Sequence, residues 1–271
     1  MAHWKDRALS RQPDGPPPAP VVQRLRIRYA KRGRLRFTSH RDFQRAFERA
    51  LRRAGVPMAY SAGFSPHPKV SYAGAAPTGV ASEAEYLEIG LAAAVDLDDL
   101  RIRLDSALPA GLDVMEIQEA TGPPLADRLE VSHWEILIHQ VTAAEAAAAV
   151  RTFLAADSIQ VERLTKQGLR TLEARVPVVD MKIVEAPRST DGKAESGSCV
   201  IMDVVVRHTT PAVRPDDVLA GLGQVAGLAP PAPPLVTRLA QGSLDAETGT
   251  VTDPLDRNQP TVSTADETLS G

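Results

Sequence analysis

The chain has 271 residues, 43% of them hydrophobic and 24% charged, a composition typical of a globular protein with one large or two small domains. No apolar run approaches the roughly 20 residues that cross a bilayer, so the sequence predicts a cytoplasmic protein without a membrane partner. Cys199 is the only cysteine, which excludes intramolecular disulfides and any iron–sulfur cluster held by three or four thiolates. No glycine-rich phosphate-binding pattern is present, and we expect no cofactor.

The formal net charge of −3 conceals an asymmetry along the chain. Residues 24 to 69 contain thirteen Lys or Arg and only two carboxylates, whereas residues 70 to 120 contain ten carboxylates and two arginines. The acidic segment could neutralise the basic one within the same domain. Net charge alone therefore does not select a class of partner.

Residues 1–22 are polar and proline-rich without sustained periodicity, and we expect a disordered leader. The following segment alternates between arginines and apolar residues, which predicts a half-buried strand. The outward residues are Arg24, Arg26 and Arg28, and the inward residues are Leu25, Ile27 and Tyr29. Beyond Gly33 the alternation resumes, with Arg34 and Arg36 outward and Leu35 and Phe37 inward.

A single apolar stripe over residues 40 to 54 predicts an amphipathic helix. Ser39, with Asp42 three residues later, is suited to capping its start, and Gly55 is suited to ending it. The next segment, Tyr60 to Lys69, is too rich in Gly and Pro for regular structure and too rich in aromatic and His side chains for an ordinary linker. We interpret it as a shaped functional loop.

The elements of residues 23–120 follow the order strand, helix, strand, strand, helix, strand, which is that of a ferredoxin-like unit, βαββαβ. The same order is expected over residues 128–240, after a Gly-Pro-Pro linker. The sequence therefore predicts an α+β fold of two ferredoxin-like halves, a divergent duplication. Residues 186–198 are expected to form a mobile hairpin loop, and residues 241–271 a disordered tail.

The arginines are the strongest argument for a nucleic-acid partner, because guanidinium groups suit phosphates and the helix presents several of them on one face. Aromatic rings beside guanidinium groups provide stacking surfaces for unpaired bases, which favours RNA. The predicted RNA-binding residues are Arg41, Arg45, Arg49, Tyr60, Phe64, His67, Lys69 and Tyr72. In the alternative interpretation, the strand arginines pair with Glu85 or Glu88, and the helix arginines form a solvated face.

His40 and His67 are candidates for a general acid and base, or for a metal site together with Glu83. Their spacing alone does not select either role, and the leading expectation is that no metal is bound. A structural role is favoured instead, with His40 hydrogen-bonded to backbone at the helix start and His67 fixing the loop between two prolines. Cys199, at the start of a strand, is expected to be a small core residue.

Four motifs carry a resemblance to a known family. They are Phe37-Thr38-Ser39-His40-Arg41-Asp42, Gly63-Phe64-Ser65-Pro66-His67-Pro68, Pro77-Thr78-Gly79 and Ser82-Glu83-Ala84-Glu85-Tyr86. With them the chain resembles the radical-SAM-linked proteins that contain the domain of unknown function 2344, over about residues 25 to 239. Members of this family occur alone or attached to radical-SAM proteins. Some resemble proteins that are encoded in bacterial gene clusters with ribonuclease E/G and ribosomal proteins.

The resemblance implies an accessory role and not radical-SAM chemistry, since that chemistry needs three closely spaced cysteines. Three hypotheses remain open from the sequence. The leading one is a non-enzymatic protein that binds RNA connected with processing or translation. The others are a nuclease-like or metal-dependent enzyme that uses His40 and His67, and a protein–protein adaptor for a radical-SAM enzyme or RNA-processing machinery.

Overall fold

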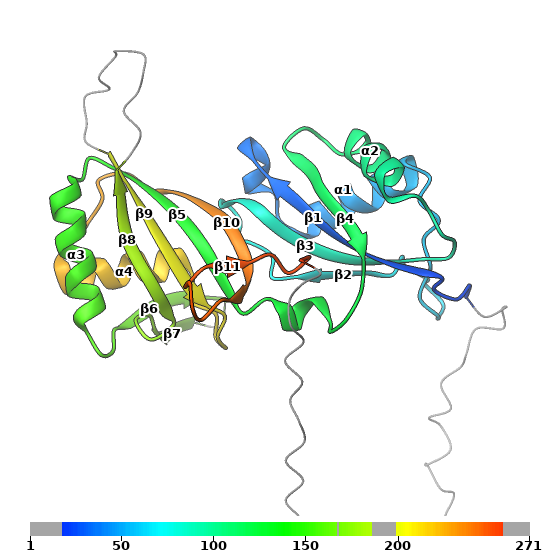
Figure 1. Ribbon diagram of the computed structural model, residues 1–271. Helices are drawn as coiled ribbons and strands as arrows, with labels where there is room; N and C mark the ends of the chain where they lie inside the picture. Colours follow the sequence, from blue (N-terminus) through cyan, green and yellow to red (C-terminus); the bar gives the residue numbers. More distant parts are fainter. Residues whose placement is uncertain (1–17, 167, 186–198, 257–271) are drawn as a thin grey trace, which may run out of the picture.

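The computed structural model describes residues 18–166, 168–185 and 199–256 (Figure 1). Its fold is α+β, with a mostly antiparallel main sheet of nine strands, a separate two-stranded hairpin and four α-helices. The strands of the main sheet are β1 (Gln23–Lys31), β2 (Val70–Ala73), β3 (Ala81–Leu91), β4 (Leu112–Glu119), β5 (Val131–His139), β8 (Val178–Glu185), β9 (Cys199–Arg207), β10 (Leu235–Leu244) and β11 (Val251–Thr252). The other elements are the hairpin strands β6 (Gln160–Thr165) and β7 (Gly168–Glu173), the helices α1 (His40–Arg53), α2 (Leu97–Ala107), α3 (Ala143–Ala155) and α4 (Pro215–Ala226), and the 3-10 helices η2 (Gly33–Phe37) and η3 (Leu125–Arg128).

The first half of the sheet has the strand order β4-β1-β3-β2, and all of its pairs are antiparallel. Helices α1 and α2 cover one face of it. The predicted inward residues Leu25 and Ile27 of β1 pack in one core with Phe43 and Phe47 of α1 and with Leu104 of α2. The inward residues of the strand and the apolar stripe of the helix therefore pack together in a single buried layer.

The second half has the order β10-β5-β9-β8, again with antiparallel pairs. Helices α3 and α4 pack on one face of these strands, around a core that includes Ile136 of β5, Phe153 of α3 and Leu222 of α4. The β6–β7 hairpin is inserted between α3 and β8. Residues 186–198, where a loop is predicted, lie outside the described residues.

The two half-sheets join where β10 runs parallel to β3, with Thr237 paired to Ala81 and Arg238 to Ser82. Strand β3 has eleven residues, so its beginning can pair with β10 while residues further along the same edge pair with β2. Both halves thus belong to one continuous sheet (Figure 1). We call this junction of β3 and β10 the seam.

Local sequence explains why α1 begins and ends where it does. The Ser39 side chain accepts a hydrogen bond from the Asp42 N–H at 3.2 Å, which caps the first turn. Gly55 follows the helix with a φ of +62°, a left-handed conformation that is unstrained for glycine. The predicted amphipathic helix is confirmed.

Residues 33–37 form the 3-10 helix η2 and not the predicted strand. Gly33 has a φ of +55°, which turns the chain away from the direction of β1. Arg32 fixes this turn, because its guanidinium pairs with Glu83 and, at 2.7 Å, with Asp113. The inward and outward assignments made for this segment from alternation therefore do not hold.

The predicted disordered tail begins at residue 241, but the structure places residues 241–244 in β10 and folds the chain back through β11. Leu255 is only 3% exposed and packs with Tyr86, Leu125 and Leu129 on the helix-free face of the first half. Asp253 accepts hydrogen bonds from Arg28 at 2.9 Å and from the Tyr86 hydroxyl at 3.2 Å. The remaining predicted tail, residues 257–271, lies outside the described residues.

The predicted leader reaches residue 22, but the Val22 N–H donates to the Leu91 carbonyl at 2.8 Å, so the chain joins the sheet before β1 begins. Residues 1–17 lie outside the described residues. Across the described ranges, no helix is long and apolar enough to cross a membrane.

Candidate nucleic-acid interface

The exposed face of α1 carries four arginines at spacings of four, four and three residues, which places them along one side of the helix. These are Arg41, Arg45, Arg49 and Arg52, and all four are exposed. Among the described residues, the one ion pair that involves this set joins Arg45 to Asp42, at 4.0 Å. An exposed pair at that distance is weak, so the helix face presents nearly uncompensated positive charge. We call it the arginine face.

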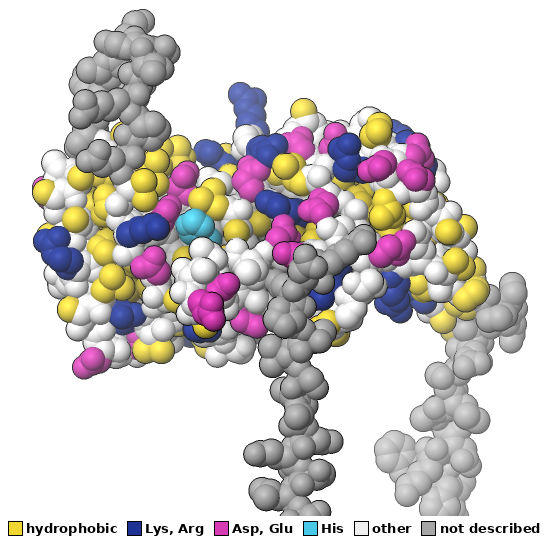
Figure 2. All heavy atoms as spheres, viewed as in Figure 1, with side chains coloured by type: hydrophobic (Ala, Val, Ile, Leu, Met, Phe, Trp, Pro, Cys, Tyr) yellow, Lys and Arg dark blue, Asp and Glu magenta, His cyan; other side chains and the backbone are white. Residues whose placement is uncertain are grey.

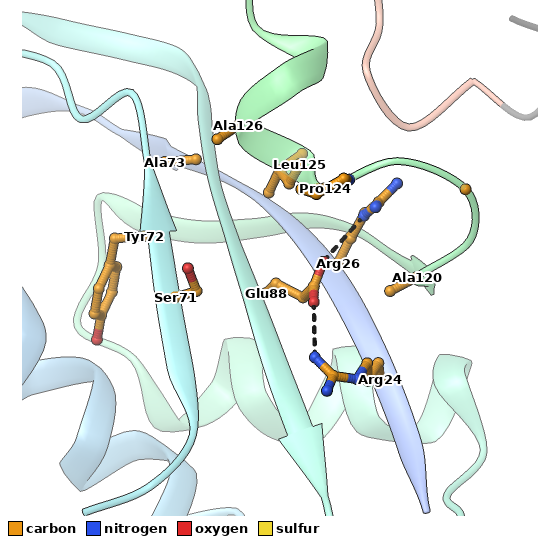
Figure 3. A pocket seen from close by; sticks show the side chains of 11 residues that line it. Arg24, Arg26, Ser71, Tyr72, Ala73, Glu88, Ala120, Pro124, Leu125 and Ala126 are labelled. Atoms are coloured by element: carbon orange, nitrogen blue, oxygen red, sulfur yellow. Dashed lines mark hydrogen bonds and ion pairs between the residues drawn. The ribbon is translucent and has the colours of Figure 1, made fainter. Parts of the chain in front are cut away.

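The arginines of β1 differ from those of the arginine face, because they form ion pairs with carboxylates or hydrogen bonds with carbonyl groups of the protein. Arg24 and Arg26 both pair with Glu88, at 3.5 and 3.3 Å, and point toward it from β1 (Figure 3). Arg28 pairs with Asp253 at 2.9 Å. The alternative interpretation is therefore correct for Glu88, whereas Glu85 pairs with Arg238 of β10 and with none of the strand arginines.

Figure 2 shows how charged side chains are distributed on one face of the molecule. On the face seen there, Lys and Arg side chains are interspersed with Asp and Glu side chains over the first half. Mixed charge of this kind attracts a polyanion weakly. The arginine face of α1, which belongs to the helix-covered side of the sheet, is the better candidate for phosphate contacts.

Phe37 is an aromatic residue of this region that sequence reasoning missed. Its side chain is 59% exposed, and the Arg36 guanidinium lies over its ring at 4.8 Å. It was assigned inward because the alternation of β1 was extended across η2. Gly33, which breaks that alternation, is the signal that could have identified Phe37 as exposed.

The functional loop is anchored at both ends and presents its rings to solvent. Ala59 donates to the Gly90 carbonyl at 2.9 Å, and Lys69 donates to the Ala59 carbonyl at 2.8 Å. Tyr60 is exposed, and Phe64 is exposed by 73%. Both rings and the Lys69 side chain are thus on the surface, where RNA contacts by them remain a prediction.

Tyr72 differs from the other predicted RNA contacts, because its ring packs under α1. The ring lies 5.1 Å from that of His40 and 5.9 Å from that of Phe43. Its hydroxyl is buried, and no hydrogen-bond partner is found for it among the described residues. Burial, together with the nearby Glu48 carboxylate, raises the pKa of Tyr72. This residue joins β2 to α1 and is not an open stacking surface.

The histidines proposed for catalysis have separate partners. Nε2 of His40 lies 3.1 Å from the Gln44 side-chain amide, and no backbone bond to the ring is found among the described residues, so the expected backbone contact is not observed. Nδ1 of His67 lies 3.0 Å from the Ser61 hydroxyl. The second contact agrees with a loop-fixing role for His67. Glu83 is paired with Arg32. No group of three His, Cys, Asp or Glu side chains in the described part of the chain could hold a metal ion.

The fold and this surface define an α+β protein with a basic helix face on a mostly antiparallel sheet. The chain belongs to the family described as an uncharacterized protein conserved in bacteria (DUF2344), whose family model matches residues 24–215. That match covers residues 24–120 of the first half, including every predicted site residue, and most of the second half. No curated protein matches the chain.

Proposed function

We propose that this chain is an RNA-binding accessory protein that acts in the cytoplasm, in RNA processing or translation, and is not itself an enzyme. The observation that carries the proposal is the arginine face of α1, where four exposed arginines have, within the described part of the chain, a single weak carboxylate partner. Such a row of guanidinium groups suits the phosphates of one strand, since each phosphate that is bound releases condensed counterions.

Exposed aromatic rings in the segments that precede and follow α1 also support RNA binding. Phe37 comes three residues before α1 begins, next to Arg36 and the exposed Arg34. Tyr60 and Phe64 are exposed in the loop that follows the helix. Unpaired bases stack on such rings while phosphates contact the arginines, which is how single-stranded segments of RNA are held.

RNA binding is tested by fluorescence anisotropy with labelled single-stranded and hairpin RNA at several salt concentrations. Arg45→Glu should weaken binding and reduce the slope of log K against log salt by about 0.7–0.9, because a phosphate contact is lost. Arg151→Glu is the matched control, since it makes the same charge change on an exposed arginine of α3. Equal binding by the two variants and the wild-type protein would refute the proposal.

The order of the strands supports a second element of the proposal, that the two halves are duplicated ferredoxin-like units. Strands β4, β1, β3 and β2 correspond in order and pairing to β10, β5, β9 and β8, with α1 and α2 corresponding to α3 and α4. The β6–β7 hairpin has no counterpart in the first half. A superposition of residues 23–120 on residues 128–244 that aligned different strands would contradict it.

A second candidate function is that of an adaptor for a radical-SAM protein or RNA-processing machinery. It is favoured by the β6–β7 hairpin, where Leu164 and Leu169 are paired across the two strands near the turn and both are exposed. Exposed apolar pairs of this kind are typical of protein contacts. Leu164→Asp should abolish binding to such a partner and leave RNA affinity unchanged. No contact in the described structure favours the enzyme hypothesis, since His40 and His67 have separate partners.

A further inference from the structure

A cavity of about 340 Å³ lies at the seam, away from the arginine face. Both halves contribute to it. Its lining residues come from the β2–β3 connection, from β5, from the end of β9 and the segment that follows it, and from β10. The volume is within the range of small-molecule sites, which often form where two units of a fold meet.

Positive charge borders this cavity, and none of its lining residues is acidic. Arg238 is buried and held rigidly, since it donates to the Gly74 carbonyl at 2.6 Å and to the Ser82 hydroxyl at 3.2 Å. The Glu85 carboxylate forms an ion pair with Arg238 and balances its positive charge. Arg214 is exposed, and no ion pair to it occurs among the described residues, so its charge remains available to a ligand.

A fixed pair of neutral polar groups lies beside these cations. His208 Nδ1 is 2.7 Å from the Leu129 carbonyl, which can only accept, so Nδ1 carries the proton. The other ring nitrogen, Nε2, therefore accepts a hydrogen bond from the Ser132 hydroxyl, at 2.7 Å. Burial lowers the pKa of His208, which keeps the ring neutral at pH 7 and this arrangement in place.

The remaining walls are apolar and include a large ring. Pro77, Val206 and Val213 line the cavity together with Trp134, whose ring is 5.4 Å from the Arg238 guanidinium carbon. Trp134 is only 6% exposed and packs in the core of the second half, so it contributes a small apolar part of the wall. Apolar walls and an exposed arginine together specify the chemistry of an occupant.

We propose that the seam cavity binds a small organic anion, with an apolar group against the wall formed by Pro77 and Val213 and a carboxylate or phosphate group paired with Arg214. Pairing with Arg214 gives a partner to a lining cation for which the described residues supply no ion pair, whereas Arg238 is paired with Glu85. The proposal is independent of RNA binding, since none of the arginine-face residues lines this cavity.

Isothermal titration calorimetry with the full chain tests the proposal with three probes that share one ring system: 1-naphthoate, 1-naphthyl phosphate and the neutral 1-naphthamide. At least one anion should bind saturably with one-to-one stoichiometry, and at least about tenfold more tightly than naphthamide. Comparison of the two anions identifies the preferred acidic group. Arg214→Ala should weaken the preferred anion by about tenfold or more, and Arg151→Ala should have no effect.

Ala212→Phe provides a second variant, because it introduces a ring into the cavity from an exposed position and should block both anions. Circular dichroism checks that each variant is folded. The proposal is overturned if neither anion binds up to about 5 mM, if naphthamide binds as tightly as the anions, or if Arg214→Ala binds the preferred anion as well as the wild-type protein does.

Discussion

Arg238 of β10 and Glu85 of β3 form an ion pair in which both side chains are only 3% exposed, at the seam where the two halves of the sheet meet. The Glu85 carboxylate also accepts the Ala76 N–H at 3.1 Å, and Gln241 reaches from β10 to the Ala84 carbonyl at 2.7 Å. The motif Ser82 to Tyr86 that resembles the family is thus largely engaged in joining the two halves.

Glu85→Gln should destabilise the protein by about 3–5 kcal/mol, because it leaves the Arg238 charge buried without a balancing carboxylate. Urea denaturation followed by circular dichroism measures the change. The double variant Glu85→Leu with Arg238→Met should recover most of the loss, since it removes both charges together. If the single variant were as stable as the wild-type protein, the pair would not contribute to joining the halves.

His208 gives the stability a predictable dependence on pH. Burial lowers its pKa in the folded protein below the ordinary value of 6.5, so the unfolded chain binds a proton more readily. Its contribution is therefore fully present above pH 6.5 and is lost as the pH falls from there toward the folded-state pKa. The difference in free energy of unfolding between pH 7.5 and pH 5.5 should be smaller in His208→Gln than in the wild-type protein. Equal differences would show that this group does not titrate on unfolding.

Tyr72→Phe should leave stability unchanged or raise it by up to about 1 kcal/mol, because it removes a buried hydroxyl that lacks a hydrogen-bond partner. The ring contacts with His40 and Phe43 are kept. The same variant should bind RNA like the wild-type protein, whereas Phe64→Ala, at an exposed ring, should bind more weakly. A loss of stability above 1 kcal/mol in Tyr72→Phe would mean that water or another group bonds to the hydroxyl.

Leu255→Ala should lower the free energy of unfolding by about 2–4 kcal/mol, as expected for a leucine in a packed core. The matched control is Leu169→Ala on the exposed side of the β6–β7 hairpin, which should change stability by less than about 0.5 kcal/mol. Similar effects of the two substitutions would contradict the packing of residues 251–256 against the first half.

Local patterns predicted the helix α1 and the existence of the strand β1, because an apolar stripe, a serine cap and strict alternation each lie within a few neighbouring residues. The prediction that β1 is half-buried was wrong, since Arg26, expected to face outward, is only 3% exposed. Local patterns also failed at η2, where one glycine redirects the chain, and at Cys199, which is exposed and not part of the core. The seam could not be predicted, because Arg238 and Glu85 are 153 residues apart. Nothing in the sequence near either residue indicates that the other is its partner. Folded structure after residue 241 was missed for the same reason, since Leu255 is buried only by distant partners.

The helix-free face of the first half is covered by residues 251–256 and the segment around η3, which bury Tyr86 beneath Leu125 and Leu255. Four-stranded RNA-binding modules commonly stack bases on aromatic side chains of their open sheet. In this protein Tyr86, on that face of the sheet, is only 2% exposed. RNA would therefore have to bind on the opposite side of the sheet, through α1 and its flanking loops. A shortened chain without residues 251–256 would expose a second surface, one to which RNA does not bind in the full chain.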